Sequence, residues 1–285
     1  MDIENCLNII KKEIEMCISI GENEGRIFDN GSLAKESLIR SSRLIGYLHE
    51  CVKEELICHK VKSGNIFPPL GSSHPEIKIT GFLKQKDQDI TIIPSNVDKE
   101  EILVDWGPLK HENTKDSFGI NYTSNCLIIN VRSQLSSLAK NADTLFERTF
   151  AEAMNLHTIY KNIVLGEVYL IPVYEYNESD AKNNIVSFST RKTNLAKYIS
   201  FFSAINDRVN SEDDEYKYER CALLIVDFSK EIPKIYNTTE ELKEDGLISD
   251  DFDLELGDIS FLNFVEDILH KYSERFDISN IVDVD

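Results

Sequence analysis

The chain has 285 residues, of which 41% are hydrophobic and 28% charged, the ordinary balance of a globular protein. Its formal net charge of −19 is uneven: residues 211–285 hold 22 acidic and 7 basic residues, a net of −15, whereas residues 1–210 hold 28 and 24, a net of −4. A duplex-binding surface must neutralise phosphates, which excludes the acidic C-terminal quarter and places any such surface in the first 210 residues. The acidic quarter is interpreted as a solvated surface or a docking surface for a basic partner.

No apolar run approaches the roughly 18 residues that a membrane-spanning helix needs. The first residues, Met1 to Asn5, carry acids before any apolar stretch, unlike a secretory signal peptide. A cytoplasmic location is therefore expected. The six cysteines are scattered without a paired spacing, which predicts small buried side chains rather than disulfides or a structural zinc site.

The first 62 residues are predicted to form a helical segment that packs on a core formed by residues 63–285. Apolar side chains recur every three or four positions over residues 3–20, which predicts an amphipathic helix ended by residues 21–25. A longer helix is expected after Asn30-Gly31, with Ser32 as its N-cap. Its exposed face is expected to carry Lys35, Arg40, Arg43 and Lys53.

Strands are expected after a Gly-, Pro- and Ser-rich loop at residues 64–75. Residues 76–83 alternate partly, as in a strand, and residues 89–93 form a second strand that Pro94 ends. Residues 95–124 are polar and turn-rich. Residues 126–131 are apolar on both faces, which predicts a third strand inside the sheet.

The second half alternates helices and buried strands. A helix is expected from a cap at residues 141–143 to about Leu156. It is followed by one long strand at 164–176, or by two strands bent at Pro172. A short strand at 185–188 and a helix at 194–208 come next, then a buried strand at 221–228 and a closing helix at 259–276. The acid-rich stretches at 209–219 and 238–258 are expected to be exposed loops or turns.

The predicted elements follow the order helix, three strands, helix and strand. Polar side chains lie at the start of the second strand and at the end of the third. Asp89 begins the second strand, and the third strand ends in Asn130-Val131-Arg132, followed by Ser133-Gln134. This arrangement resembles the core of the PD-D/E-x-K nuclease superfamily, to which many Type II restriction endonucleases belong. In that family an acid begins the second strand and a Glu-x-Lys or Asp-x-Lys tripeptide lies in the third. The resemblance covers about a third of the chain.

The resemblance implies a restriction-endonuclease-like α/β fold, with a mixed sheet flanked by helices and an extra N-terminal helical segment. It implies Mg²⁺ held by oxygen ligands, with the metal activating a water that attacks a phosphodiester bond. Asp89 is assigned to the metal, Asn130 helps through its carbonyl, Arg132 contacts the scissile phosphate, and Gln134 orients water or phosphate. The expected substrate is double-stranded DNA, cut by a homodimer whose two-fold symmetry matches that of the target.

Asn130 and Arg132 depart from the family pattern. An amide is an uncharged, poor metal ligand, and arginine does not deprotonate in proteins, so it cannot act as a base. Either metal ligation has moved to neighbours such as Asp89, Glu147 or Glu152, or the chain has lost cleavage and kept binding. A buried pair between Arg132 and Glu147 or Glu152 is equally compatible with the pattern, and Asp89 has the alternative of only capping a strand entry. Glu76-Ile77-Lys78 also matches Glu-x-Lys, but so short a match occurs often by chance.

Basic side chains near the candidate site suit phosphate contacts or the balancing of nearby acids; those predicted to bind DNA are Lys84, Lys86, Lys140 and Arg148. The second hypothesis for function is a non-catalytic, nuclease-fold subunit of a defence or DNA-processing complex. It would dock on a partner protein through the acidic residues 211–285.

Overall fold

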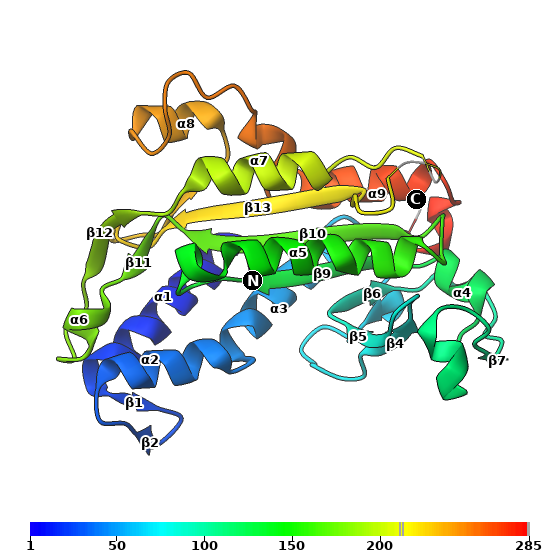
Figure 1. The fold of residues 1–285 in the computed structure, drawn as a ribbon, viewed down its shortest axis with the longest axis horizontal. Coiled ribbons are helices and arrows are strands. Elements are labelled where there is room, and N and C mark those ends of the chain that lie inside the picture. Colours follow the sequence, from blue (N-terminus) through cyan, green and yellow to red (C-terminus); the bar gives the residue numbers. More distant parts are fainter. Residues whose placement is uncertain (211, 213, 284–285) are drawn as a thin grey trace.

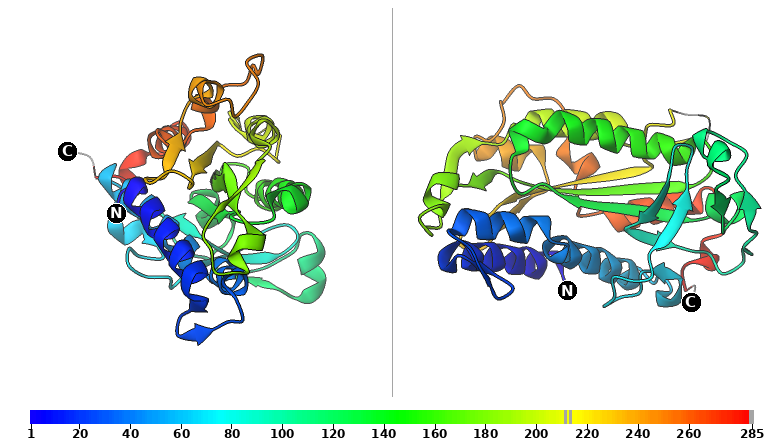
Figure 2. Two further views of the ribbon diagram at one scale, coloured as in Figure 1. Left: turned by 90° about the vertical axis from the view of Figure 1, so that its left-hand side faces the viewer. Right: turned by 60° about the horizontal axis from the view of Figure 1, so that its bottom comes forward.

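A computed structural model describes residues 1–210, 212 and 214–283 of the chain. Within these residues a central sheet of six strands lies between two layers of helices (Figures 1 and 2), which confirms the α/β class. Across the sheet the strands follow the order β14 (Lys234–Tyr236), β13 (Arg220–Asp227), β10 (Val164–Pro172), β9 (Leu127–Ser133), β6 (Ile90–Ile92) and β3 (Ile66–Phe67). Strands β9, β10 and β13 are parallel, while β14, β6 and β3 each run antiparallel to their neighbours.

The three parallel strands are apolar on both sides because helices cover both faces of the sheet. Successive side chains alternate between two separate hydrophobic cores. One core includes residues of α1 (Ile3–Ile20), α3 (Arg43–Cys58) and α9 (Phe264–Ser273). The other lies beneath α5 (Leu138–His157) and α7 (Leu195–Ile205).

Gly166 of β10 sets how closely α9 approaches the sheet. A Cβ at this position would lie 2.4 Å from Ile268 Cδ1 and 2.9 Å from Phe264 Cζ, both on α9. A larger residue here would therefore push the ends of these two side chains aside, so Gly166 serves close packing rather than an unusual backbone angle.

The N-terminal helices confirm one prediction and correct another. Helix α1 has the predicted bounds and ends at Gly21, whose left-handed backbone closes the last turn. The predicted second helix is instead two, α2 (Gly31–Arg40) and α3, with Asn30 rather than Ser32 as the N-cap. At the break, the hydroxyl of Ser41 donates to the carbonyl of Leu38, a local bond that competes with helix continuation.

Two lysines predicted on the exposed face of that helix are buried. Lys35 lies 2.5 Å from Glu178, and Lys53 lies 2.6 Å from Glu50 while also donating to the carbonyl of Ser72. Tertiary partners satisfy both ammonium groups, so neither needs solvent.

The strand order around residues 64–95 differs from the prediction. The first strand of the central sheet is β3, which lies within the predicted loop. The predicted strand at 76–83 contains β4 (Ile77–Thr80), but it pairs with β5 (Gln85–Gln88) in a separate two-stranded sheet. Residues 95–124 hold the short β7 (Ile102–Leu103), β8 (Lys115–Asp116) and α4 (Ile120–Ser124).

Helix α5 starts at Leu138, three residues before the predicted cap, because the carboxylate of Glu175 accepts the Leu138 N–H at 3.3 Å. The predicted bend at Pro172 is confirmed, since β10 ends there and β11 (Tyr174–Tyr176) begins a side hairpin. The hairpin is completed by α6 (Glu178–Ala181) and β12 (Phe188–Lys192). Between α1 and α2 lie β1 (Glu22–Asn23) and β2 (Arg26–Ile27), and α8 (Thr239–Glu244) follows β14.

Two boundaries in the acidic quarter also change. Helix α8 lies inside the stretch 238–258 that was predicted as loop, and the closing helix α9 starts five residues later than predicted. A capping box between Thr238 and Glu241 starts α8, so a local acid promotes the helix here. Among the described residues, no helix has the length and apolar character needed to cross a membrane.

Candidate active site

Three oxygen-bearing side chains form a row across neighbouring strands, which we call the oxygen row: Asp89, Asn130 and Glu167. Ile90 pairs with Ile129 across antiparallel β6 and β9, so Asp89, one residue before β6, continues this register opposite Asn130. Asn130 pairs directly with Glu167 in parallel β10. Side chains two residues away from this row, such as Ile128, belong to the core beneath α5, so the row faces α5.

Asp89 is the partly exposed end of the row. Its Oδ2 accepts the backbone N–H of Val131 at 2.9 Å, which extends the β6–β9 pairing by one residue. The imidazole of His49, on α3, interacts electrostatically with this carboxylate. Burial lowers the pKa of His49, and the charge of Asp89 opposes that shift. Asp89 thus caps the strand entry and also presents a carboxylate to the row.

Asn130 and Glu167 are the buried part of the row, with 2% and 0% of their surfaces exposed. Neither carboxylate oxygen of Glu167, nor Oδ1 of Asn130, accepts a hydrogen bond from any described residue. Burial raises the pKa of Glu167; Arg132 opposes this, and the charges of Glu152 and Asp89 add to it. The row therefore contains buried oxygens that accept no hydrogen bond within the described residues, although Oε1 of Glu167 lies in ion-pair contact with Arg132.

Arg132 connects the row to α5. Its Nη2 pairs with Glu152 of α5, and its Nε lies 2.7 Å from Oε1 of Glu167. Burial disfavours the guanidinium charge, but Glu167, Tyr218 and Glu152 outweigh it and raise the pKa of Arg132. Of the two alternative pairs left open by the sequence, the pair with Glu152 forms.

The carboxylate of Glu152 forms ion pairs with three basic side chains. Besides Arg132, it binds Lys86 of β5 at 2.9 Å and Arg148 of α5 at 3.3 Å. Burial raises its pKa, but Arg132 and Lys86 outweigh that effect and lower the pKa of Glu152 to about 2. Lys86 and Arg148, both predicted to contact DNA, are thus engaged by an internal carboxylate.

The other predicted site residues lie away from the row. Glu147 is exposed, and five helical residues, roughly 140° around the α5 axis, separate it from Glu152. Gln134 is buried at the junction of β9 and α5, where it accepts a hydrogen bond from Tyr198 at 2.8 Å and donates to the carbonyl of Leu138 at 3.4 Å. Through these hydrogen bonds Gln134 stabilises the junction between β9 and α5.

Lys84 and Lys140 are both exposed, but at opposite ends of α5. Lys140 is in the first turn, whereas the turn holding Lys84 is bound near the other end by Asn155, whose Oδ1 accepts the Leu83 N–H at 2.7 Å. Fifteen helical residues correspond to roughly 22 Å. The four predicted DNA-binding residues therefore do not form one compact patch.

Glu167 is the member of the row that the sequence prediction missed. It is the only charged residue in the otherwise apolar strand β10. A single acid inside a strand that is buried on both faces is the signal that points to it, because a buried carboxylate needs a partner.

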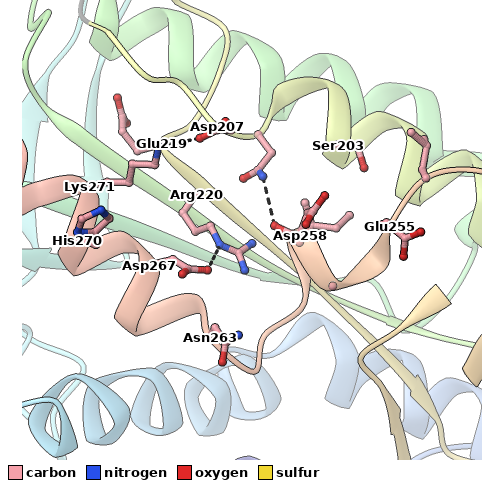
Figure 3. A pocket seen from close by; sticks show the side chains of 14 residues that line it. Ser203, Asp207, Glu219, Arg220, Glu255, Asp258, Asn263, Asp267, His270 and Lys271 are labelled. Atoms are coloured by element: carbon pink, nitrogen blue, oxygen red, sulfur yellow. Dashed lines mark hydrogen bonds and ion pairs between the residues drawn. The ribbon is translucent and has the colours of Figure 1, made fainter. Parts of the chain in front are cut away.

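A separate cavity of about 630 Å³ lies at the start of β13, between α7 and α9. Acids outnumber bases among its charged lining residues, and they include Asp207, Asp258 and Asp267 (Figure 3). Arg220 donates to Asp267 at 2.8 Å, and Lys271 lies 2.7 Å from Asp207, so basic side chains of the lining are paired with its acids.

Comparison with protein-family models, with curated proteins and with solved structures finds no match for this chain. In the part of the chain that the structure describes, no three His, Cys, Asp or Glu side chains converge as a group able to hold a metal ion. The oxygen row has two carboxylates and one amide, and the amide of Asn130 is not among those residue types. Any assignment of function therefore depends on the chemistry of the row and its surroundings.

Proposed function

We propose that the protein is a Mg²⁺-dependent endonuclease of double-stranded DNA with a restriction-endonuclease-like fold. The observation that carries the proposal is that Asp89, directly before β6, stands in register with Asn130 of the adjacent strand β9, and that Arg132, two residues further along β9, pairs with Glu152 of α5. With β4, β5, β7, β8 and α4 left aside as insertions, the chain order α3, β3, β6, β9, α5, β10 follows the helix, three strands, helix and strand expected of that nuclease core.

The residues present suit a hard cation. Asp89 offers a carboxylate, and the buried Oδ1 of Asn130 has no hydrogen-bond donor among the described residues. Oxygen ligands of this kind are those that Mg²⁺ prefers, with one or two carboxylates and several waters. When bound, Mg²⁺ would polarise the phosphate and lower the pKa of a bound water.

Arg132 has a defined role in this proposal. Its guanidinium is permanently charged, so it stabilises negative charge on the phosphate instead of removing a proton. Glu152 holds it in place through α5. In this proposal Asp89, at the start of β6, binds the metal, and Arg132 of β9 binds the phosphate.

The test is incubation of the purified protein with mixed plasmid and phage DNA in Mg²⁺, in Mn²⁺ and in EDTA. Discrete fragments that require metal are expected, and Asp89→Ala should lower the rate by about 100-fold or more, because the metal contributes several kcal/mol to the barrier. Asp87→Ala is the matched control, since this exposed aspartate lies two residues away on β5. Equal cleavage by the wild type and Asp89→Ala rules out the role of Asp89.

A second candidate function is that of a non-catalytic subunit that docks on a basic partner. The acidic cavity between α7 and α9 favours it, because Glu255 and Asp258 are exposed at its lining. DNA affinity distinguishes the two functions: a nuclease binds DNA with an affinity that falls as salt rises. A folded protein that neither binds nor cuts DNA, but binds a basic protein, supports the second function.

A further inference from the structure

The oxygen row has a feature that the nuclease family pattern does not require. Position 130 holds an amide where that pattern has an acid, and the adjacent strand holds a carboxylate directly beside it, Glu167. Adjacent strands are about 4.8 Å apart, so the side chain of Asn130 lies between those of Asp89 and Glu167 on one face. The row therefore keeps two carboxylates, although one comes from a different strand.

We propose that Glu167 supplies the second carboxylate of a divalent-cation site, with Asp89 as the first and Asn130 as a neutral oxygen ligand between them. This inference deepens the proposed nuclease function and rests on it for the use of the cation. Binding of the cation, however, is measured separately from cleavage.

The unsatisfied oxygens are the first support. Both oxygens of Glu167 and Oδ1 of Asn130 are buried and accept no hydrogen bond from the described part of the chain. A buried carboxylate without hydrogen bonds is costly unless it is paired or binds a cation. Among the described residues, Glu167 has one ion-pair contact, from Nε of Arg132 to its Oε1 at 2.7 Å, and this contact does not form a hydrogen bond, so both oxygens of Glu167 can still accept a ligand.

The position of Arg132 is the second support. Another guanidinium nitrogen, Nη2, is bound to Glu152. Arg132 therefore keeps a carboxylate partner when a cation binds Glu167. Glu152 is the positioning residue in this arrangement, because it holds Arg132 at the edge of the row. Asp89 is partly exposed, so the row opens to solvent at that end.

The ligand chemistry selects the class of cation. The row offers three oxygen-bearing side chains and neither sulfur nor nitrogen donors, which suits Mg²⁺ or Mn²⁺. Two carboxylates are enough, because Mg²⁺ keeps several waters in its coordination shell. The row needs no third acid, which reconciles it with the absence of a group of three acidic, His or Cys ligands among the described residues.

The experiment measures Mn²⁺ binding to the whole chain without DNA, by calorimetry and by electron paramagnetic resonance, with Mg²⁺ as competitor. Glu167→Gln should weaken Mn²⁺ binding by at least about tenfold, the loss typical of residues that support a metal site. Glu147→Gln, an exposed glutamate on α5, is the matched control and should bind as the wild type does. A wild type that binds no Mn²⁺, or equal binding by Glu167→Gln, overturns the inference.

A second variant covers the case in which Glu167→Gln fails to fold. Asn130→Asp adds a carboxylate inside the row, so it should tighten Mn²⁺ binding and increase the rise in melting temperature caused by Mn²⁺. An unchanged affinity in this variant also overturns the site. Mn²⁺ binding that depends on Glu167, without DNA cleavage, keeps the cation site and rejects the nuclease. Metal-dependent cleavage that is unaffected by Glu167→Gln rejects the site and keeps the nuclease.

Discussion

Two glutamates, one on β10 and one directly before the neighbouring strand β13, are both completely buried, yet their surroundings differ. Glu219, directly before β13, accepts hydrogen bonds from Arg208 at 3.0 Å, Arg275 at 2.7 Å and the Leu165 N–H at 2.7 Å. Glu167, on β10, has one ion-pair contact and no hydrogen bond within the described structure. Burial is the same for both, so the number of donors separates a carboxylate that stabilises the fold from one that remains open to a ligand.

The pKa values follow this difference. Burial raises the pKa of Glu219, but His157, Arg275 and the Leu165 N–H outweigh it and lower the pKa to about 2. For Glu167, burial dominates and the pKa rises. Hydrogen bonds to the charged form stabilise that form, whereas desolvation alone disfavours it. The following predictions test whether the two carboxylates behave as differently as their contacts indicate.

The largest effect is expected from Glu219→Ala. The substitution removes this carboxylate from the buried charge of Arg208 and the partly buried charge of Arg275, which should lower the free energy of unfolding by roughly 3–5 kcal/mol. Urea denaturation followed by circular dichroism measures it. Glu255→Ala, at an exposed acid, is the control and should change stability by less than about 0.5 kcal/mol. A loss below 1 kcal/mol in Glu219→Ala would falsify the structural role.

Acidification should reproduce part of this loss. The folded-state pKa of Glu219, about 2, lies below the ordinary 4.5, so its stabilisation is present above pH 4.5 and is lost as the pH falls towards 2. The lost contribution is about 3 kcal/mol, from roughly 1.4 kcal/mol per pKa unit. The free energies of unfolding of the wild type and Glu219→Gln, measured by denaturation at pH 6, 4 and 3, should become more alike as the pH falls. A difference between the two proteins that stays constant at all three pH values would contradict the assignment.

A smaller effect is expected from Glu167→Gln. The fold disfavours the ionised form of Glu167, and Arg132 keeps its contact with Glu152, so the free energy of unfolding near pH 7 should fall by less than the roughly 3–5 kcal/mol typical of a broken buried pair. Thermal and urea denaturation in metal-free buffer measure it. A loss as large as that of Glu219→Ala would show that both glutamates are structural.

The smallest effect is expected from Lys86→Ala. Glu152 keeps Arg132, and Lys86 is partly exposed, so the loss should be below about 1 kcal/mol. The same denaturation experiment at low and high salt measures it. A loss that greatly exceeds this value and persists in high salt would show that Lys86, rather than Arg132, is the main partner of Glu152.

The candidate site was partly predictable because some of its signals are local. Asp89 stands at the start of a strand that Pro94 limits, and Asn130 and Arg132 alternate along one strand, so their shared face follows from the two-residue period of strands. Glu152 was one of two proposed partners for Arg132, since helical spacing alone did not decide between it and Glu147. Glu167 was not predicted, because its contact with Asn130 depends on pairing between strands that are far apart in the sequence.

The sequence by itself determined the α/β class, helix α1 with its Gly21 end, and the buried strand β13, because apolar periodicity and left-handed glycines act within a few residues. Only the tertiary structure decided that β3, rather than residues 76–83, joins the central sheet. It also decided the start of α5 and the different partners of Glu167 and Glu219. Strand register, capping by distant side chains and desolvation of a carboxylate are non-local, so they are settled only when the chain has packed.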